Sequence, residues 1–253
     1  MKSLAGIIIT LNEEQHIERC LASLKFCDEI IIVDSGSSDR TLEIARKITA
    51  KIFSHPWEGY SAQRNFALQL TQCRWVLSID ADEEASSDLA AEIDRVFCLP
   101  DKYLAFTVPR KTFHSGRWIK HGGWYPNRLV RLFKKGEGRW VGNELHERWL
   151  SPGPVGKLEG HLYHYSFSSI TDQVDRNNRY SSLGAVALSK KGERFSLLKL
   201  LGKPIFKFIE TYVVKLGFLD GRRGFMIAVS AAYSVFLKWA KLWEIQGRRR
   251  VSV

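Results

Sequence analysis

Two aspartates separated by one residue, Asp80 and Asp82, follow the strand-like apolar segment 75–79. Carboxylates this close repel one another and resist burial, so fold stability alone does not explain the pair. A hard divalent cation such as Mg²⁺ or Mn²⁺, shared between the carboxylates and a phosphate, makes the arrangement favourable. Glu83 and Glu84 come next and can be explained more simply as the acidic start of a helix. The aspartate pair therefore predicts a metal and phosphate site.

The elements that must position this pair alternate along the first 110 residues or so. We expect strands at residues 4–11, 29–34, 51–53, 75–79 and 104–108, with helical segments between them, among them 60–70 and 87–97. Alternation of this kind predicts an α/β fold with a mostly parallel sheet and right-handed crossovers. In such sheets ligands bind at the carboxyl ends of the strands. Residues 110–170 change in texture, and we expect irregular loops and short strands there, including 129–133, packed beside the sheet.

Polar residues also end the first two strands. The first is followed by Thr10-Leu11-Asn12-Glu13 and the second ends in Asp34-Ser35-Gly36-Ser37-Ser38-Asp39. With Gln63-Arg64-Asn65 and the aspartate pair, these segments resemble, in this order, the nucleotide-sugar signatures of family 2 glycosyltransferases. Within that family, the similarity is greatest to the type that acts as a lipopolysaccharide inner-core β-1,4-glucosyltransferase. It extends through residues 127–133, 141–147 and 219–225.

The resemblance implies a GT-A fold, with a Rossmann-like mixed sheet and a C-terminal helical appendage. It implies transfer of a hexose, glucose in this subgroup, from a UDP-sugar donor to a lipopolysaccharide or lipooligosaccharide inner-core heptose. The residues that it implies for nucleotide-sugar binding at the first two strands are Thr10, Asn12, Glu13, Asp34 and Ser35. For Asn12, Glu13 and Ser35, ordinary turn and capping chemistry is the alternative.

The resemblance also assigns the diphosphate end of the donor. Asp80 and Asp82 match the Asp-x-Asp motif, which binds the sugar ribose and a divalent metal, Mg²⁺ or Mn²⁺, that bridges the two phosphates. Arg64 would place a fixed positive charge near the diphosphate, where a planar guanidinium suits phosphate oxygens; an exposed helical arginine is the alternative. His164 matches a late histidine that completes the metal site in several GT-A enzymes, and a buried or stacking histidine is the alternative.

Sugar transfer of this kind has an oxocarbenium-like transition state and needs a base to take the proton of the acceptor hydroxyl. One carboxylate suffices, and in-line displacement then inverts the anomeric carbon. The candidates are Glu144 and Glu147, and the subgroup pattern favours Glu147. The Glu-Asp pair that many family 2 members carry at this point is missing from the sequence. For either glutamate, a salt bridge with Arg139 or Arg148 is the alternative.

The positive charge of the chain is concentrated in its last quarter. The whole sequence has a net charge of +11 from 38 Lys and Arg against 27 Asp and Glu. Residues 190–253 hold 14 of these bases and 4 of the acids, so they carry +10 and residues 1–189 carry +1. Apolar residues are interleaved with these bases, which predicts helices in the interface of an anionic membrane. A helical cap on the main domain or an oligomer interface are the alternatives.

These features predict two domains and a location. We expect a catalytic domain over residues 1–170, with a nucleotide-sugar half to about 110 and an acceptor and base half from about 111, followed by a basic amphipathic helical region over 171–253. The apolar run 224–237 has 14 residues, short of the roughly 20 that span a bilayer. Four scattered cysteines and an N-terminal apolar stretch too short for a signal peptide predict a cytoplasmic enzyme. It would lie peripherally on the inner face of the cytoplasmic membrane and act on a lipid-linked glycan.

Other functions are compatible with parts of the sequence. The same donor motifs would serve transfer to a polyprenyl phosphate or to another glycan acceptor. A nucleotidyltransferase would want a Gly-rich, Lys-bearing loop after the first strand, which residues 10–16 do not supply. A basic nucleic-acid-binding or membrane-binding protein is the non-enzyme alternative. No nucleic-acid partner is expected, because the charge is confined to the apolar-rich tail and no stacking sheet motif, zinc finger or basic recognition helix is present.

Overall fold

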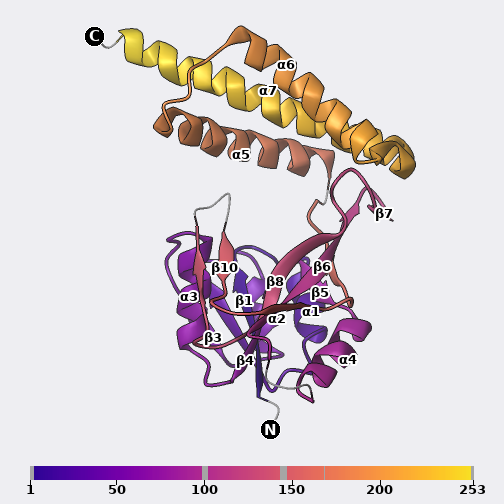
Figure 1. Ribbon diagram of the computed structural model, residues 1–253. Coiled ribbons are helices and arrows are strands. Elements are labelled where there is room, and N and C mark those ends of the chain that lie inside the picture. The colour runs from indigo at the N-terminus through magenta and orange to yellow at the C-terminus, as the bar shows by residue number, and fades with distance from the viewer. Residues whose placement is uncertain (1–2, 99–101, 143–146, 168, 252–253) are drawn as a thin grey trace. The chain divides into compact units, whose positions relative to one another are not determined.

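The structure, a computed structural model, describes residues 3–98, 102–142, 147–167 and 169–251 (Figure 1). The chain divides into two compact units. The first consists of Met1–Lys111 and Asn127–Tyr165, and the second of Thr112–Pro126 and Ser166–Val253. The second unit thus takes in a short insertion from the middle of the chain as well as the C-terminal helices.

A mixed sheet lies at the centre of the first unit. In sheet order its strands are β3 (Ile52–Ser54), β2 (Glu29–Asp34), β1 (Leu4–Thr10), β4 (Trp75–Asp80), β8 (Asn127–Lys134), β6 (Ala105–His114), β12 (Leu162–His164) and β5 (Glu83–Ala85). β11 (Val155–Lys157) pairs with β6, and β9 (Arg139–Val141) and β10 (Arg148–Leu150) form a separate antiparallel pair. The strands β3, β2, β1 and β4 are parallel, as predicted. Their register pairs Thr10 with Asp34 and Ile9 with Asp80, so the three polar strand ends meet at one edge.

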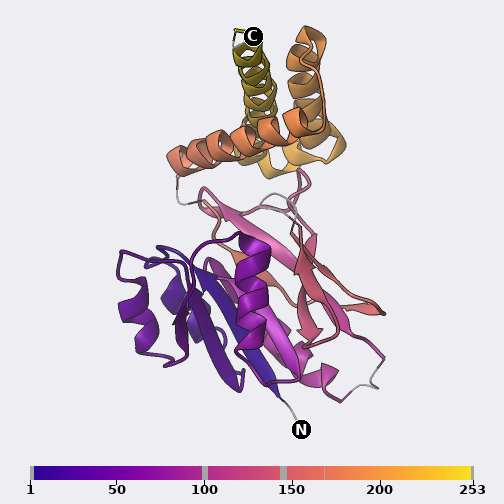
Figure 2. The same cartoon turned by 90° about the vertical axis from the view of Figure 1, so that its left-hand side faces the viewer.

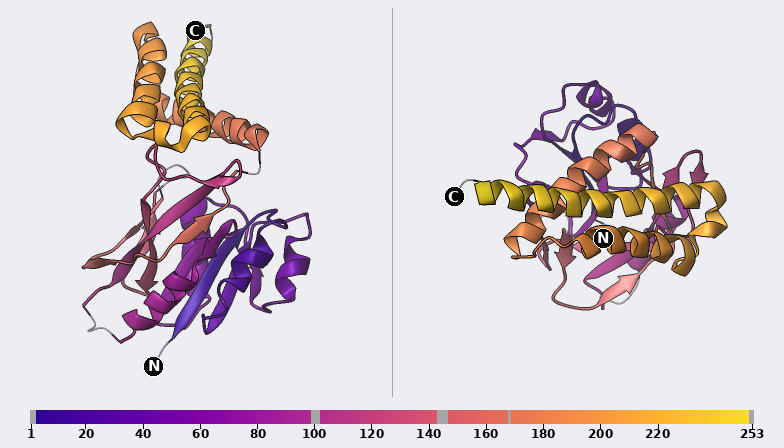
Figure 3. Two further views of the ribbon diagram at one scale, coloured as in Figure 1. Left: turned by 90° about the vertical axis from the view of Figure 1, so that its right-hand side faces the viewer. Right: turned by 90° about the horizontal axis from the view of Figure 1, so that it is seen from above.

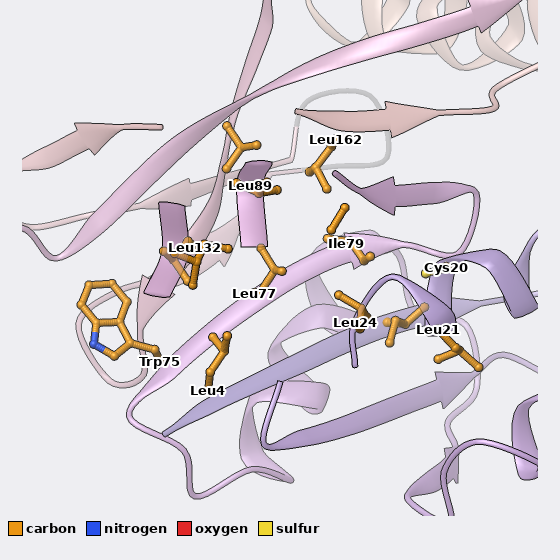
Figure 4. Close-up of a cluster of buried hydrophobic side chains, with 14 of the residues drawn as sticks. Leu4, Cys20, Leu21, Leu24, Trp75, Leu77, Ile79, Leu89, Leu132 and Leu162 are labelled. Atoms are coloured by element: carbon orange, nitrogen blue, oxygen red, sulfur yellow. The ribbon is translucent and has the colours of Figure 1, made fainter. Parts of the chain in front are cut away.

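Helices cover both faces of the parallel part of the sheet. They are α1 (Ile17–Ala22), α2 (Thr41–Arg46) and α4 (Ser87–Val96) on one face, and α3 (Tyr60–Gln69) on the other (Figure 2). Successive side chains of a strand point to opposite faces, and β1 therefore serves both cores. Leu4 (Figure 4) and Ile8 join the core beneath α1 and α4, while Ile7 joins the core beneath α3. This double burial explains the unbroken apolar runs of β1 and β2.

One strand lies where the sequence did not predict it. The segment 129–133, expected to pack beside the sheet, belongs to β8, which is inserted into the sheet between β4 and β6 and runs antiparallel to both. β6 consequently runs in the direction of the parallel strands but is not adjacent to them. The insertion is stabilised from both faces, because Leu132 and Phe133 are fully buried in the two opposite cores. The sheet is mixed for this reason.

The second unit is helical. α5 (Ile170–Lys190) and α6 (Leu197–Ile209) both pack on α7 (Gly221–Val251), and the short helical turns η1 (Glu210–Val214) and η2 (Gly217–Asp220) connect α6 to α7 (Figure 3). Ser169 caps α5 by accepting a hydrogen bond from the Asp172 amide at 3.0 Å. The unit also contains β7 (Arg117–Trp118), paired with the end of β6.

The apolar C-terminal helix is longer than the sequence suggested. The run 224–237 was expected to be too short for a bilayer, but the helical region continues beyond Lys238. Within the described residues, Gly217–Arg248 is long and apolar enough, by length and composition, to cross a membrane.

Candidate active site

The first aspartate of the motif is held between two arginines. Asp80 is the last residue of β4, and its Oδ1 accepts a hydrogen bond from Arg64 Nη2 at 2.6 Å. Its Oδ2 accepts from Arg131 Nη2 at 2.7 Å. Both guanidinium groups are buried, Arg64 reaching Asp80 from α3 and Arg131 from β8. Both oxygens of Asp80 thus have a cationic partner within the protein.

Glu83 extends this network. Its Oε1 accepts from Arg131 Nη2 at 2.9 Å and from Arg110 Nη1 at 3.3 Å, and its Oε2 accepts from the Asp80 backbone amide at 2.9 Å. The interpretation of Glu83 as a helix-start acid is wrong, because it is a buried residue of β5 and the cap of α4 is Ser86. Two carboxylates and three guanidinium groups therefore surround the end of β4.

These charges control protonation at the strand end. Burial alone would raise the pKa of the Asp80 carboxyl, but Arg131 and Arg64 outweigh it and hold the pKa well below its usual range. Burial likewise disfavours the Arg131 cation, and Asp80 and Glu83 reverse that effect and raise its pKa. Asp80 is therefore ionised and Arg131 charged at neutral pH.

We expect Arg131→Lys to lower the free energy of unfolding by about 2–3 kcal/mol, because a shorter side chain with one nitrogen cannot keep both the Nη2 contacts to the carboxylates and the Nη1 contact to the Ser78 carbonyl in a buried site. Arg128→Lys in the same strand is the matched control. Arg128 donates to a carboxylate of Glu159 that is 75% exposed, and exposed pairs contribute about 0–1 kcal/mol. Urea unfolding of both variants measures the difference, and equal losses would contradict a structural role for the Arg131 contacts.

The second aspartate lies beside the predicted histidine. Asp82 Oδ2 is 3.3 Å from His164 Nε2, and both side chains are mostly buried. Strand pairing sets this contact, because β12 lies antiparallel to β5 with His164 opposite Glu83, and the Tyr165 amide donates to the Asp82 carbonyl at 2.9 Å. The structure thus brings together two residues that are 82 positions apart in the chain.

This pair fits a divalent cation better than Asp80 does. A carboxylate oxygen and an imidazole nitrogen side by side are suitable ligands for Mn²⁺, and Mg²⁺ commonly takes only one or two protein carboxylates with phosphate and water completing its shell. Among the described residues, no group of three or more His, Cys, Asp or Glu side chains could hold a metal. Asp82 and His164 could therefore supply two ligands to a divalent cation, while the oxygens of Asp80 are engaged by arginines.

The residues predicted to hold the nucleoside lie at the ends of β1 and β2. Asp34 Oδ2 accepts from the Gly36 and Ser37 amides, both at 2.9 Å, and so shapes the turn after β2. Asn12 has a positive φ of 55° and its Oδ1 accepts from the Ser38 amide at 2.8 Å. The side chain of Asn12 therefore ties the loops that follow the two strands to each other, while Asp34 orders the turn after its own strand.

The remaining three nucleoside candidates differ in their partners. Ser35 Oγ accepts from Gln63 Nε2 at 2.6 Å, and Glu13 Oε2 lies 2.9 Å from His16 Nδ1. These contacts are consistent with the turn and structural roles that the sequence left open. Thr10 Oγ1 is different, because it is buried and makes no hydrogen bond within the described part of the chain. A buried hydroxyl without a partner is rare, and here it lies at the strand edge where a ligand is expected.

Arg64 and Glu147 meet at the same strand end. Arg64 is 2% exposed, so the exposed-arginine alternative is wrong. Its guanidinium lies 4.5 Å from the centre of the Trp140 ring, and its Nη2 lies 3.9 Å from Glu147 Oε1. The structure thus places the favoured base candidate next to the arginine that holds Asp80. Glu144, the other candidate, lies outside the described residues.

Comparison with known proteins identifies the chain. The family model described as Glycosyl transferase family 2 matches residues 7–151. The chain belongs to glycosyltransferase family 2. This membership confirms the predicted enzyme class, and with the mixed sheet it confirms the predicted GT-A fold.

Relatives of this glycosyltransferase resemble nearly its whole length. An uncharacterized glycosyltransferase of Rickettsia typhi is 34% identical over 99% of this chain and 90% of its own length. The lipopolysaccharide core biosynthesis glycosyltransferase LpsC of Rhizobium meliloti is 31% identical over 95% of this chain and 92% of its own. Among solved structures, glucosyl-3-phosphoglycerate synthase from Mycobacterium tuberculosis in complex with Mg²⁺ and uridine-diphosphate has a TM-score of 0.49 and 16% identity, covering 77% of this chain and 81% of that one.

Proposed function

We propose that this glycosyltransferase is an inverting, metal-assisted enzyme that transfers a hexose from a UDP-sugar to a lipopolysaccharide inner-core heptose. The observation that carries the proposal is the edge of the sheet where β1, β2 and β4 end. There Asp82 lies against His164, and Asp80 is fixed between two buried arginines. Glucose as the donor sugar rests on the resemblance of the sequence, and the heptose acceptor on that resemblance and on the similarity to LpsC.

Different residues would bind different parts of the UDP-sugar donor. Thr10, with its unpartnered hydroxyl, and Asp34 would receive the nucleoside at the ends of β1 and β2. Asp82 and His164 would hold the divalent metal, which supplies positive charge to the leaving diphosphate when it is bound. Asp80 keeps Arg64 and Arg131 in place, and Arg64 brings a guanidinium with fixed orientation to the same edge. This arrangement is preorganised for a polyanionic ligand.

Glu147 would act on the acceptor. As the acceptor oxygen attacks the anomeric carbon, Glu147 takes the proton of that hydroxyl, the new glycosidic bond forms, and the bond from the anomeric carbon to the diphosphate oxygen breaks. UDP leaves with the electron pair of the broken bond. Because attack and departure occur on opposite faces of the sugar, the anomeric configuration inverts.

We expect UDP-glucose with Mn²⁺ to raise the thermal unfolding midpoint more than GDP- or TDP-sugars do. A ligand that binds the folded state at about a hundred times its Kd stabilises it by about 2.7 kcal/mol. A thermal melt across a panel of nucleotide sugars, repeated with EDTA, measures both donor choice and metal dependence. If no nucleotide sugar stabilises the chain, or if EDTA leaves the stabilisation unchanged, the proposed donor site is wrong.

The acceptor is tested separately with the preferred donor. Transfer of labelled hexose to lipooligosaccharide truncated at the inner-core heptose is expected, with inversion at the anomeric carbon read by NMR. Transfer to a polyprenyl phosphate instead would keep the donor chemistry and replace the proposed acceptor. Salt-sensitive binding to random DNA without any sugar transfer would favour the non-enzyme alternative.

A further inference from the structure

The α6 helix has its apolar side turned to solvent. Although eight of its 13 residues are leucine, isoleucine or phenylalanine, no residue of α6 is buried. Six large apolar side chains are between 45% and 86% exposed: Leu197, Leu198, Leu201, Ile205, Phe206 and Ile209. Their spacing along the helix places them on one broad side. A surface helix of a soluble domain normally turns such a side inward, so this exposure calls for a partner.

The lysines of α6 lie on its other side. Lys199 Nζ and Lys203 Nζ lie 5.3 and 5.9 Å from the centre of the Trp239 ring of α7, and Lys207 Nζ lies 3.0 Å from Glu210 Oε2. The helix thus packs on α7 through the side that carries its lysines, and the ammonium groups of Lys199 and Lys203 lie over the Trp239 ring. The lysine side of α6 therefore faces α7, and the exposed apolar side chains of α6 point away from it.

The same surface continues beyond α6. Val213, Val214, Phe218 and Leu219, from the turns η1 and η2, are 45–70% exposed. Residues 190–253 as a whole carry a net charge of +10. An exposed apolar surface on a segment of net positive charge is complementary to an anionic bilayer. The acyl chains accept the apolar side chains, and the anionic head groups attract the positively charged segment.

The α7 helix remains part of the helical unit despite its length. Asn177 Nδ2 donates to Ser230 Oγ at 2.7 Å, and Lys241 Nζ donates to Ser181 Oγ at 2.8 Å, both across the contact with α5. Trp239 is buried in the core of the unit. Insertion of α7 across a bilayer would break these contacts and leave their polar groups without partners in hydrocarbon. The geometry favours a helical unit that lies on the membrane.

We propose that residues 197–219 form a membrane-docking surface that lies in the plane of an anionic bilayer. The exposed side chains of α6 enter the boundary between head groups and acyl chains, and the net positive charge of residues 190–253 attracts the anionic head groups. This inference is independent of the sugar-transfer chemistry, because every residue that it uses belongs to the helical unit.

Cosedimentation of the full chain with phospholipid vesicles tests the docking surface. We expect strong binding to phosphatidylcholine vesicles that contain phosphatidylglycerol, and binding at least about tenfold weaker to phosphatidylcholine alone. Leu198→Glu and Phe206→Glu should each lower the partition coefficient at least about tenfold, because each removes a large side chain from hydrocarbon. Leu150→Glu, at a 41% exposed leucine of β10, is the matched control and should bind as the parent does.

Other occupants of this surface predict other results. Circular dichroism melts establish that the variants are folded, which is expected because the substituted side chains are exposed. Unchanged vesicle binding by both α6 variants would overturn the proposal. So would light scattering that shows a parent dimer lost in the variants, which indicates a second copy on this surface. Membrane-bound protein that resists extraction by alkaline carbonate would indicate a spanning α7 instead.

Discussion

Asp82→Asn should lower kcat/KM for sugar transfer by about a thousandfold or more, because a metal at a leaving group stabilises the transition state by several kcal/mol. Asp82 and His164 are adjacent at 3.3 Å, and in the proposed metal site an amide would replace the anionic ligand with a weak neutral one. The effect should be larger on kcat than on donor KM, since charge on the diphosphate grows as the bond to the sugar breaks. UDP release at increasing Mn²⁺ concentrations measures it, and the variant should require much more metal.

The matched control for this substitution is Asp88→Asn. Asp88 lies in the first turn of α4, is exposed, and undergoes the same change of charge. It should retain parental kcat/KM. The double variant Asp82→Asn with His164→Ala provides a second check. Substitutions of residues that bind the same ion have non-additive effects, so the double variant should lose little more activity than the worse single variant. Fully additive losses, or full activity of Asp82→Asn, would contradict a shared metal.

The strand ends could be predicted from the sequence because their signal is local. The apolar runs of β1, β2 and β4 each end abruptly at polar residues, and the alternation with helices implies parallel strands whose carboxyl ends coincide. The observed register, with Thr10 opposite Asp34 and Ile9 opposite Asp80, agrees with the prediction that these ends lie at one edge. The proximity of Asp82 and His164 was available only from the family resemblance, because no local pattern relates the turn before β5 to β12.

The buried arginine network could not be predicted in the same way. Arg131 stands in the middle of an apolar strand-like segment, which is a usable sign of a buried charge with a partner, but only the insertion of β8 beside β4 identifies that partner as Asp80. Glu83 follows an aspartate and precedes a helix, so local rules favoured a helix start. Long-range pairing with β12 overrides them and makes it a buried strand residue.

For the helical unit, too, the sequence predicts only part of the arrangement. Periodicity in the sequence indicates that α6 has an apolar side and a basic side, but it does not determine which of them packs inward. The contacts of Lys199 and Lys203 with Trp239 decide the matter. An amphipathic pattern alone would usually be interpreted as a helix with its apolar side buried in the protein, which is the opposite of the arrangement here.

Glu147→Gln should lower kcat by about a hundredfold to ten-thousandfold, the range for loss of a general base. Glu147 Oε1 lies 3.9 Å from Arg64 Nη2, which also donates to Asp80 at 2.6 Å, so the carboxylate lies beside the strand end where we propose that donor and acceptor meet. The glutamine keeps the shape of the side chain and cannot accept a proton. Initial rates with saturating donor and acceptor measure the loss, and binding of UDP, measured by calorimetry, should change little.

Two comparisons separate a base from a residue that merely positions Arg64. A base leaves its mark on the pH dependence, so the acidic limb of the kcat profile should disappear in Glu147→Gln while the parent retains it. Loss of an Arg64 partner would instead weaken donor binding and leave that limb in place. Glu144→Gln is the matched variant, with the same chemical change three residues earlier, and should keep most of its activity. A large loss in Glu144→Gln with an active Glu147→Gln would reassign the base to Glu144, because only one carboxylate is needed to take the acceptor proton in a single inverting displacement.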